Sequence, residues 1–116
     1  MYKQINPQTI YSAVPASDDA TDGQEIALVE LVCITVKKTT TASSTSAPVT
    51  IQASLDGEDW DDLSGTSTTI DNTTTFKLYD LGGTGGGLSF RYVRLKFGTL
   101  TNPGDTFEVK FGGKGV

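Results

Sequence analysis

The chain has 116 residues, a net charge of −5 and a single cysteine, so it is one acidic domain whose stability does not depend on an internal disulfide. The acidic balance argues against partners with a phosphate backbone and against anionic membranes, so we expect no nucleic acid and no membrane among its partners. Histidine is absent, which excludes Ser-His and Cys-His nucleophiles and most zinc sites, and we expect no catalytic residue, no cofactor and no metal.

Residues 1–25 predict an extended N-terminal arm in front of a folded domain at residues 26–116. The segment is polar, contains Pro7 and Pro15, and ends in a cluster of acidic residues. Its apolar residues follow neither a period of 2 nor one of 3.6, so they indicate no regular element. We expect them to attach the arm to another surface. These apolar residues are Ile5, Ile10, Tyr11 and Val14.

Residues 26–38 are the longest apolar run and predict a strand that is buried on both faces. One face would carry Leu28, Val32, Ile34 and Val36, and the other would carry Val29, Leu31 and Cys33. A small antiparallel sandwich normally leaves one sheet face in water, so the second apolar face needs a cover. We expect the arm or a neighbouring copy of the chain to supply it. We expect Cys33 to be a buried, inert thiol.

Residues 49–63 predict a strand, a turn and a lone tryptophan. Apolar residues at every second position from Val49 to Leu55 alternate with polar ones, as in a strand with one dry face. Asp56-Gly57 predicts a turn, after which Trp60 would return over the core. The polar residues 39–48, which precede this strand, predict a mobile loop.

The next segment is rich in threonine and glycine. Residues 65–75 predict a short edge strand, and residues 76–81 predict a strand with Phe76 and Leu78 on one face. The glycine-rich residues 82–87 lack the Gly-Lys-Ser/Thr ending of a phosphate-binding loop, so they predict a connector.

Two clear strands complete the chain. Residues 90–97 and 106–111 alternate apolar and polar side chains, and Asn102-Pro-Gly-Asp105 between them has the residue types of a type II turn. Together with 18 threonines and 13 glycines, about seven or eight short strands predict an all-β fold. The expected architecture is an antiparallel β-sandwich or jelly-roll.

The densest group of charges follows the Asp56-Gly57 turn. Its carboxylates are oxygen ligands that calcium prefers, but their spacing differs from that of an EF-hand loop, and we expect a solvated turn. They offer little cleft for a glycosidase pair. These acidic residues are Asp56, Glu58, Asp59, Asp61 and Asp62.

Two motifs carry a family resemblance. Ser54-Leu-Asp-Gly-Glu-Asp-Trp60, followed by Phe90-Arg-Tyr-Val-Arg-Leu95, resembles the strand and turn of discoidin-like carbohydrate- or lipid-binding modules. It also resembles small β-sandwich structural proteins of tailed bacteriophages, including head-decoration (cement) and tail or baseplate proteins. The chain is shorter than discoidin modules, has no cysteine pair and shows no signal peptide, and these departures favour the phage group.

The phage resemblance implies a non-enzymatic virion protein that decorates the outer shell of a phage head. Its implied partners are the major capsid protein and further copies of itself, since such decoration proteins commonly form trimers. We hypothesise that Val29, Leu31 and Cys33 help to form the oligomer, and that the apolar residues of the arm contact the capsid.

Two alternatives remain open at this stage. The first is a carbohydrate-binding module of a phage tail or host-recognition apparatus, which predicts Trp60 or Tyr79 exposed on a concave surface. The second is a structural adaptor in the tail or neck, which the sequence does not separate from a decoration protein.

Overall fold

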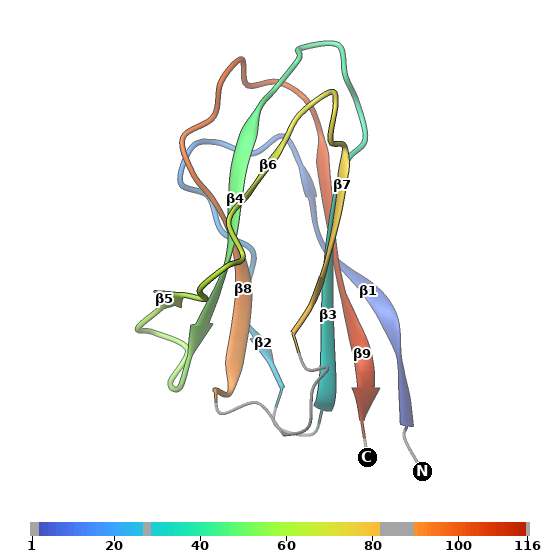
Figure 1. The fold of residues 1–116 in the computed structure, drawn as a ribbon, viewed down its shortest axis with the longest axis vertical. Helices are drawn as coiled ribbons and strands as arrows, with labels where there is room; N and C mark the ends of the chain where they lie inside the picture. Colours follow the sequence, from blue (N-terminus) through green and yellow to red (C-terminus); the bar gives the residue numbers. More distant parts are fainter. Residues whose placement is uncertain (1–2, 27–28, 82–89, 116) are drawn as a thin grey trace.

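The computed structural model describes residues 3–26, 29–81 and 90–115. All regular structure in these ranges is β, and the strands form two sheets that face each other (Figure 1). The first sheet has the order β1-β9-β3-β7, and every neighbouring pair in it is antiparallel. Its strands are β1 (Lys3–Ala13), β3 (Val29–Lys38), β7 (Phe76–Asp80) and β9 (Phe107–Gly115).

The second sheet has the order β2-β8-β4-β5. The short strand β6 also pairs with β4, on the same side of β4 as β5. Its strands are β2 (Gln24–Glu25), β4 (Ala47–Ser54), β5 (Asp61–Asp62), β6 (Thr68–Ile70) and β8 (Tyr92–Phe97). The prediction of an all-β antiparallel sandwich is therefore confirmed. The described residues contain nine strands instead of seven or eight, because several of them are only two or three residues long.

The core lies between the sheets and follows the alternation of the long strands. On β8, Val93, Leu95 and Phe97 point inward and are fully buried, while the residues between them are half-buried. Phe97 lies at the centre of an aromatic cluster. Its ring centroid is 5.4 Å from that of Tyr11 and 5.6 Å from that of Phe107, so β1, β8 and β9 are joined by ring contacts.

The first strand corrects the prediction of an N-terminal arm. β1 pairs with β9 from Lys3 opposite Gly115 to Ala13 opposite Phe107, so these residues belong to the first sheet. Two register shifts in this pairing, on either side of residues 8 and 9, break the period of 2 that would have revealed the strand. Pro7 is tolerated because β1 is an edge strand.

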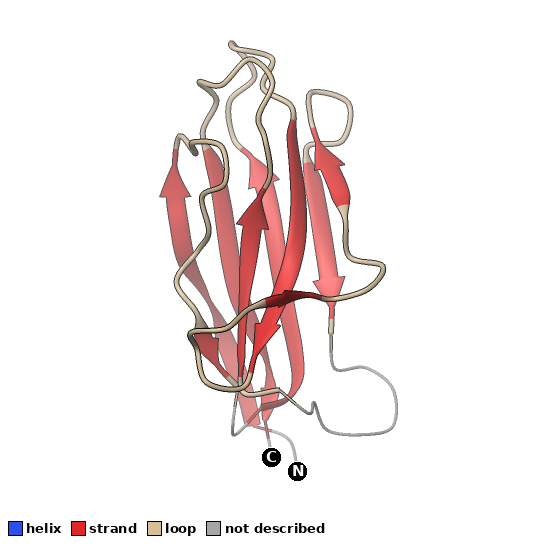
Figure 2. Cartoon of the chain, turned by 90° about the vertical axis from the view of Figure 1, so that its left-hand side faces the viewer, coloured by secondary structure: helices blue, strands red, loops and turns tan. Residues whose placement is uncertain are grey.

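The predicted mobile loop at residues 39–48 is also different in the structure. Asp105 is buried and fixes this loop: its Oδ1 accepts hydrogen bonds from Thr40 Oγ1 (3.1 Å) and the Ser43 amide (3.0 Å), and its Oδ2 accepts one from the Thr45 amide (2.9 Å). Figure 2 shows several loops at the end of the sandwich opposite the termini. Polar composition predicted mobility here because the partner, Asp105, lies about sixty residues away in sequence.

Gly104 allows the two loops to approach each other. Its φ of +143° lies in a region that favours glycine, and a Cβ at this position would lie 2.5 Å from Ser43 Oγ. The Asp105 side chain can therefore reach the backbone of the loop.

Candidate functional surfaces

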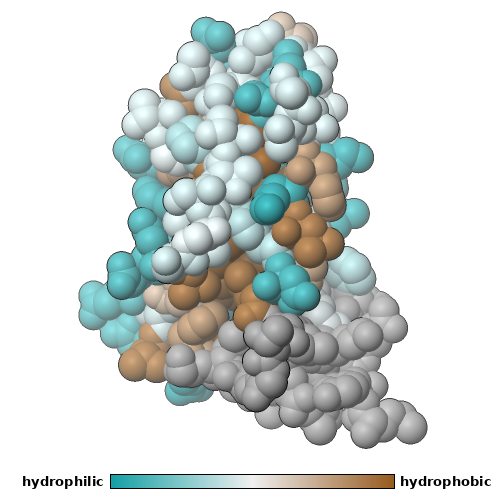
Figure 3. All heavy atoms as spheres, viewed as in Figure 1, coloured by the Kyte–Doolittle hydropathy of each residue, from teal (hydrophilic) through white to brown (hydrophobic). Residues whose placement is uncertain are grey.

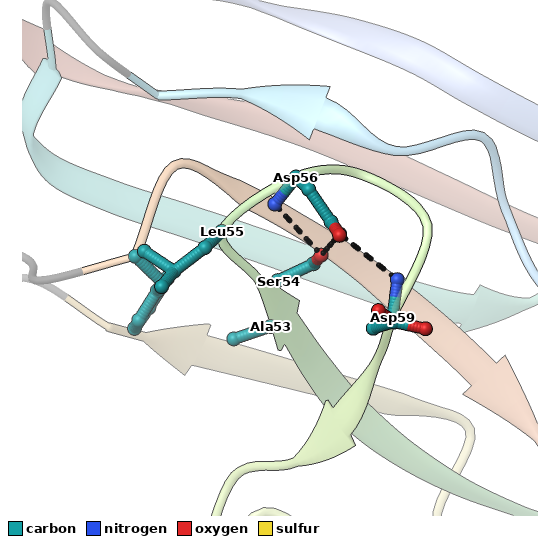
Figure 4. Close-up of a pocket in the computed structure, with 6 residues that line it drawn as sticks. Ala53, Ser54, Leu55, Asp56 and Asp59 are labelled. Atoms are coloured by element: carbon teal, nitrogen blue, oxygen red, sulfur yellow. Dashed lines mark hydrogen bonds between the residues drawn. The ribbon is translucent and has the colours of Figure 1, made fainter.

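The Asp56-Gly57 turn is organised by one carboxylate. Asp56 Oδ1 accepts hydrogen bonds from Ser54 Oγ (2.9 Å), the Glu58 amide (2.8 Å) and the Asp59 amide (2.9 Å), as Figure 4 shows in part. The Ser54 hydroxyl in turn accepts a hydrogen bond from the Gly57 amide (2.9 Å). The amides of Asp59 and Glu58, followed by the Ser54 hydroxyl, lower the pKa of Asp56 to about 2.

An open depression lies beside this turn, with a volume of about 370 Å³. It is lined by Ala53, Ser54, Leu55, Asp56, Asp59 and Phe90. Asp56 is a weak base at neutral pH because its pKa is so low, and its Oδ1 is already occupied. The residues of the chain that the structure describes contain no group of three or more possible metal ligands. The expected solvated turn describes this region best.

Trp60 does not return over the core, which corrects the expectation from its sequence position. It is half-buried outside the second sheet, where the Arg94 guanidinium lies 4.3 Å from the centre of its ring. Arg94 Nε donates to Gln52 Oε1 (2.8 Å), and both residues occupy the outward positions of their strands. The indole also contacts Gly23, where an added Cβ would lie 2.9 Å from the ring.

The reason for this placement is that the inward positions of β4 and β8 are already filled. Ile51 and Leu95 are opposite each other in register, and both are completely buried. The motif therefore places its tryptophan as a cover over the outside of the sheet. Tyr79, the other aromatic residue expected for sugar stacking, is only 5% exposed.

Cys33 lies on the outer face of the first sheet, where Asp80 of β7 is its neighbour in register. Val32, Ile34 and Val36 point into the core as expected, and Cys33 on the opposite face is half-buried. Burial, followed by the nearby Asp80, raises the pKa of the Cys33 thiol, so this thiol is not activated.

The sequence did not identify Phe76 and Leu78 as surface residues. Both are 50% exposed on the outer face of β7, and Figure 3 shows apolar side chains gathered along this strand. The alternation in β7 defines two faces, and the core takes the face with Tyr79. In register, Leu78 lies opposite Thr35 and Phe76 lies opposite Lys37.

The predicted contact residues fall on two separate strands. Ile10 and Tyr11 lie on β1 and are packed against the core, whereas Val14, just after β1, is 53% exposed. The backbone of Ile5 pairs with Gly113. Val29 and Leu31 pair with Gly115 and Lys114, and the side chains of these three predicted residues lie outside the described part of the structure. β9 lies between β1 and β3, so the two predicted groups are on strands that do not pair with each other.

No family model matches the chain, and no curated protein sequence matches it. Among solved structures, it is similar to the one described as "Crystal structure of SPBc2 prophage-derived protein YomS". The two share 12% sequence identity and a TM-score of 0.58 over 97% of this chain and 95% of that one. At this identity the similarity shows the fold, and it covers both sheets. Among the described residues, no helix is long and apolar enough to cross a membrane.

Proposed function

We propose that this chain is a non-enzymatic structural protein of a bacteriophage particle, and that it decorates the outer shell of the head. The observation that carries the proposal is the fold similarity to a prophage-derived protein along nearly the whole chain. The motif that led to the phage resemblance, Ser54 to Trp60, is a structural turn in the fold, as a scaffold role requires.

The chemistry of the ionisable groups supports a structural role. Asp105 and Lys38 form an ion pair of 2.9 Å that is almost completely buried, and it holds the loops at one end of the sandwich. Burial raises the pKa of the Cys33 thiol, and the carboxylate of Asp56 is fixed by the amides of its own turn. Each of these groups stabilises the fold. None of them forms the hydrogen bond between a nucleophile and a general base that covalent catalysis requires.

The proposed partners are the major capsid protein and further copies of this chain. In the N-terminal segment, the exposed side chain of Val14 provides an apolar contact for the capsid protein. The outer face around Cys33 provides the surface for self-association. The resemblance to decoration proteins implies a trimer on the shell. The carbohydrate-binding alternative is not favoured, since Arg94 covers Trp60 and Tyr79 is buried.

The proposal is tested by adding the purified chain to phage heads that lack it and measuring co-sedimentation. We expect saturable binding at a fixed number of copies per head, and we expect Val14→Asp to weaken it. Leu55→Asp is the matched control, because Leu55 is 68% exposed in the turn after β4, which belongs to the other sheet. Heads that bind no protein, or tails that bind it instead, would contradict the proposal. Removal of residues 1–20 is unsuitable, because it would also remove β1.

A further inference from the structure

The two sheets have four edges, and three of them are protected against pairing with another chain. β1 contains Pro7 and two register shifts. In the second sheet, β2 is two residues long, and the other edge consists of β5, which is two aspartates, and β6, which is three residues long. Short strands, charges, prolines and bulges are the features that block the extension of a sheet. β7 is different, because it has five residues, no proline and no register shift against β3.

The hydrogen bonds that flank β7 show which of its backbone groups face outward. The Lys38 amide donates to Thr75 O (2.8 Å), and the Leu81 amide donates to Val32 O (2.8 Å). Backbone groups of successive residues in a strand point to opposite sides, so the odd-numbered residues from 75 to 81 bond to β3. The N–H and C=O groups of Phe76, Leu78 and Asp80 therefore face the free edge. Within the described residues, β7 has β3 as its sole neighbour in the sheet.

The side chains of this edge are also suited to a contact. Phe76 and Leu78 are each half exposed on the outer face, where a solitary domain would be expected to carry polar residues. On the other face of β7, the Lys77 ammonium lies 5.7 Å from the centre of the Tyr79 ring, so this lysine is close to an aromatic surface.

We propose that β7 pairs with β7 of a second copy of this chain, antiparallel about a two-fold axis through Leu78, so that two four-stranded sheets become one. In this register each Leu78 lies opposite Leu78 of the partner subunit, and Phe76 lies opposite Asp80 of the partner subunit. Every edge-facing N–H and C=O group of Phe76, Leu78 and Asp80 then has a partner. Backbone pairing of this kind is a general mode of strand addition.

The sequence of β7, Phe-Lys-Leu-Tyr-Asp, is complementary to itself in this register. Lys77 lies opposite Tyr79 of the partner subunit, which allows the cation–π contact to form across the axis as well. Lys37 is adjacent to Phe76 in the sheet and so lies in the same row as Asp80 of the partner subunit, which puts opposite charges on either side of Phe76. The apolar pair at Leu78 occupies the centre.

This inference is independent of shell binding, because it concerns the purified chain in solution. A two-fold contact closes with two copies, whereas the trimer implied by the phage resemblance needs a head-to-tail contact. The stoichiometry in solution therefore separates the two proposals.

The test is sedimentation equilibrium of the full chain over a range of concentrations. We expect the unmodified chain to form dimers. Leu78→Lys and Leu78→Glu should each raise the dissociation constant by at least about tenfold, because like charges then face each other on the axis. An equimolar mixture of the two variants should restore the dimer, since residue 78 faces only its own copy in the partner subunit. Leu55→Lys, at an exposed leucine elsewhere, is the matched control and should remain dimeric.

Leu78→Pro provides a second variant. Proline at this position removes one N–H group, which faces the free edge, and an edge strand tolerates proline at such a position. Circular dichroism should therefore show a retained fold, while the dimer is lost. A chain that is monomeric at all concentrations, or a trimer that is unaffected at Leu78, would overturn the inference. Failure of the Lys and Glu variants to pair with each other would overturn the register. None of these results bears on whether the chain binds phage heads.

Discussion

The substitution Lys38→Met should destabilise the fold far more than its single position suggests. Lys38 is 3% exposed, and its Nζ donates to Thr45 O (2.8 Å) and to Asn72 Oδ1 and pairs with Asp105 Oδ2 (2.9 Å). Methionine preserves most of the aliphatic volume but removes the donor and the charge. Asp105 would then remain as a buried carboxylate without a cation.

The expected loss is large because the pair is buried. Removal of one partner of a buried ion pair leaves the other charge uncompensated, and for a domain of this length the melting temperature should fall by roughly 10–20 °C. The amides of Ser43 and Thr45 still bond to Asp105, so the chain should still fold at low temperature. The loops that Asp105 holds should be the first part of the variant to unfold.

Thermal unfolding followed by circular dichroism measures this effect, and the exposed ion pair of Arg91 and Glu25 provides the control. Those two side chains are 59% and 52% exposed at an N···O distance of 3.0 Å, so Glu25→Gln should change stability by about 0–1 kcal/mol. If Lys38→Met lowers the melting temperature no more than Glu25→Gln does, the buried network does not support the fold as described.

Three further predictions concern acid, the first strand and the tryptophan. Burial by itself would raise the pKa of Asp105, but the amides of Ser43 and Thr45 together with Lys38 and Thr40 lower it. The stabilisation from Asp105 is therefore complete above the ordinary carboxyl pKa and is lost progressively as the pH falls below about 4. Urea unfolding across this range should show the loss, and Asp105→Asn should flatten it; an equally steep dependence in that variant would refute the assignment. Tyr11→Ala should cost about 1–3 kcal/mol by loss of the contact with Phe97, whereas a detachable arm would give no change in the urea midpoint. Arg94→Ala should shift Trp60 emission to the red and increase its quenching by acrylamide, and an unchanged spectrum would show that the guanidinium does not cover the ring.

The strands that alternate without interruption could be predicted from the sequence. In β8 the period of 2 runs from Val93 to Phe97 and coincides with the buried positions, because each strand packs one face against the opposite sheet. The first strand could not be predicted in this way. Two register shifts and Pro7 remove its periodicity, and its pairing with β9 depends on contact between the two ends of the chain.

Contacts between distant segments explain the other differences. The loop that contains Ser43 and Thr45 has a polar composition typical of mobility, but a single carboxylate, Asp105, orders it. Trp60 was expected in the core because it follows a strand and a turn, yet other residues, such as Ile51 and Leu95, fill the inward positions of β4 and β8. Local sequence does not contain this information.

The candidate surface was predicted in part. The outward position of Cys33 follows from the period of β3, but the thiol is half-buried, whereas the sequence predicted a buried one. The exposure of Phe76 and Leu78 could not be foreseen, because an alternating strand at a sheet edge does not reveal which of its two faces meets the core.

Quantitative mass spectrometry of purified phage particles, after separation of heads from tails, tests the central proposal most directly. The particles are taken from the cells that carry the gene. If the chain is a decoration protein, its peptides will be found with the heads at a fixed ratio to those of the major capsid protein. Its absence from the particles, or its presence in the tail fraction alone, would contradict the proposal.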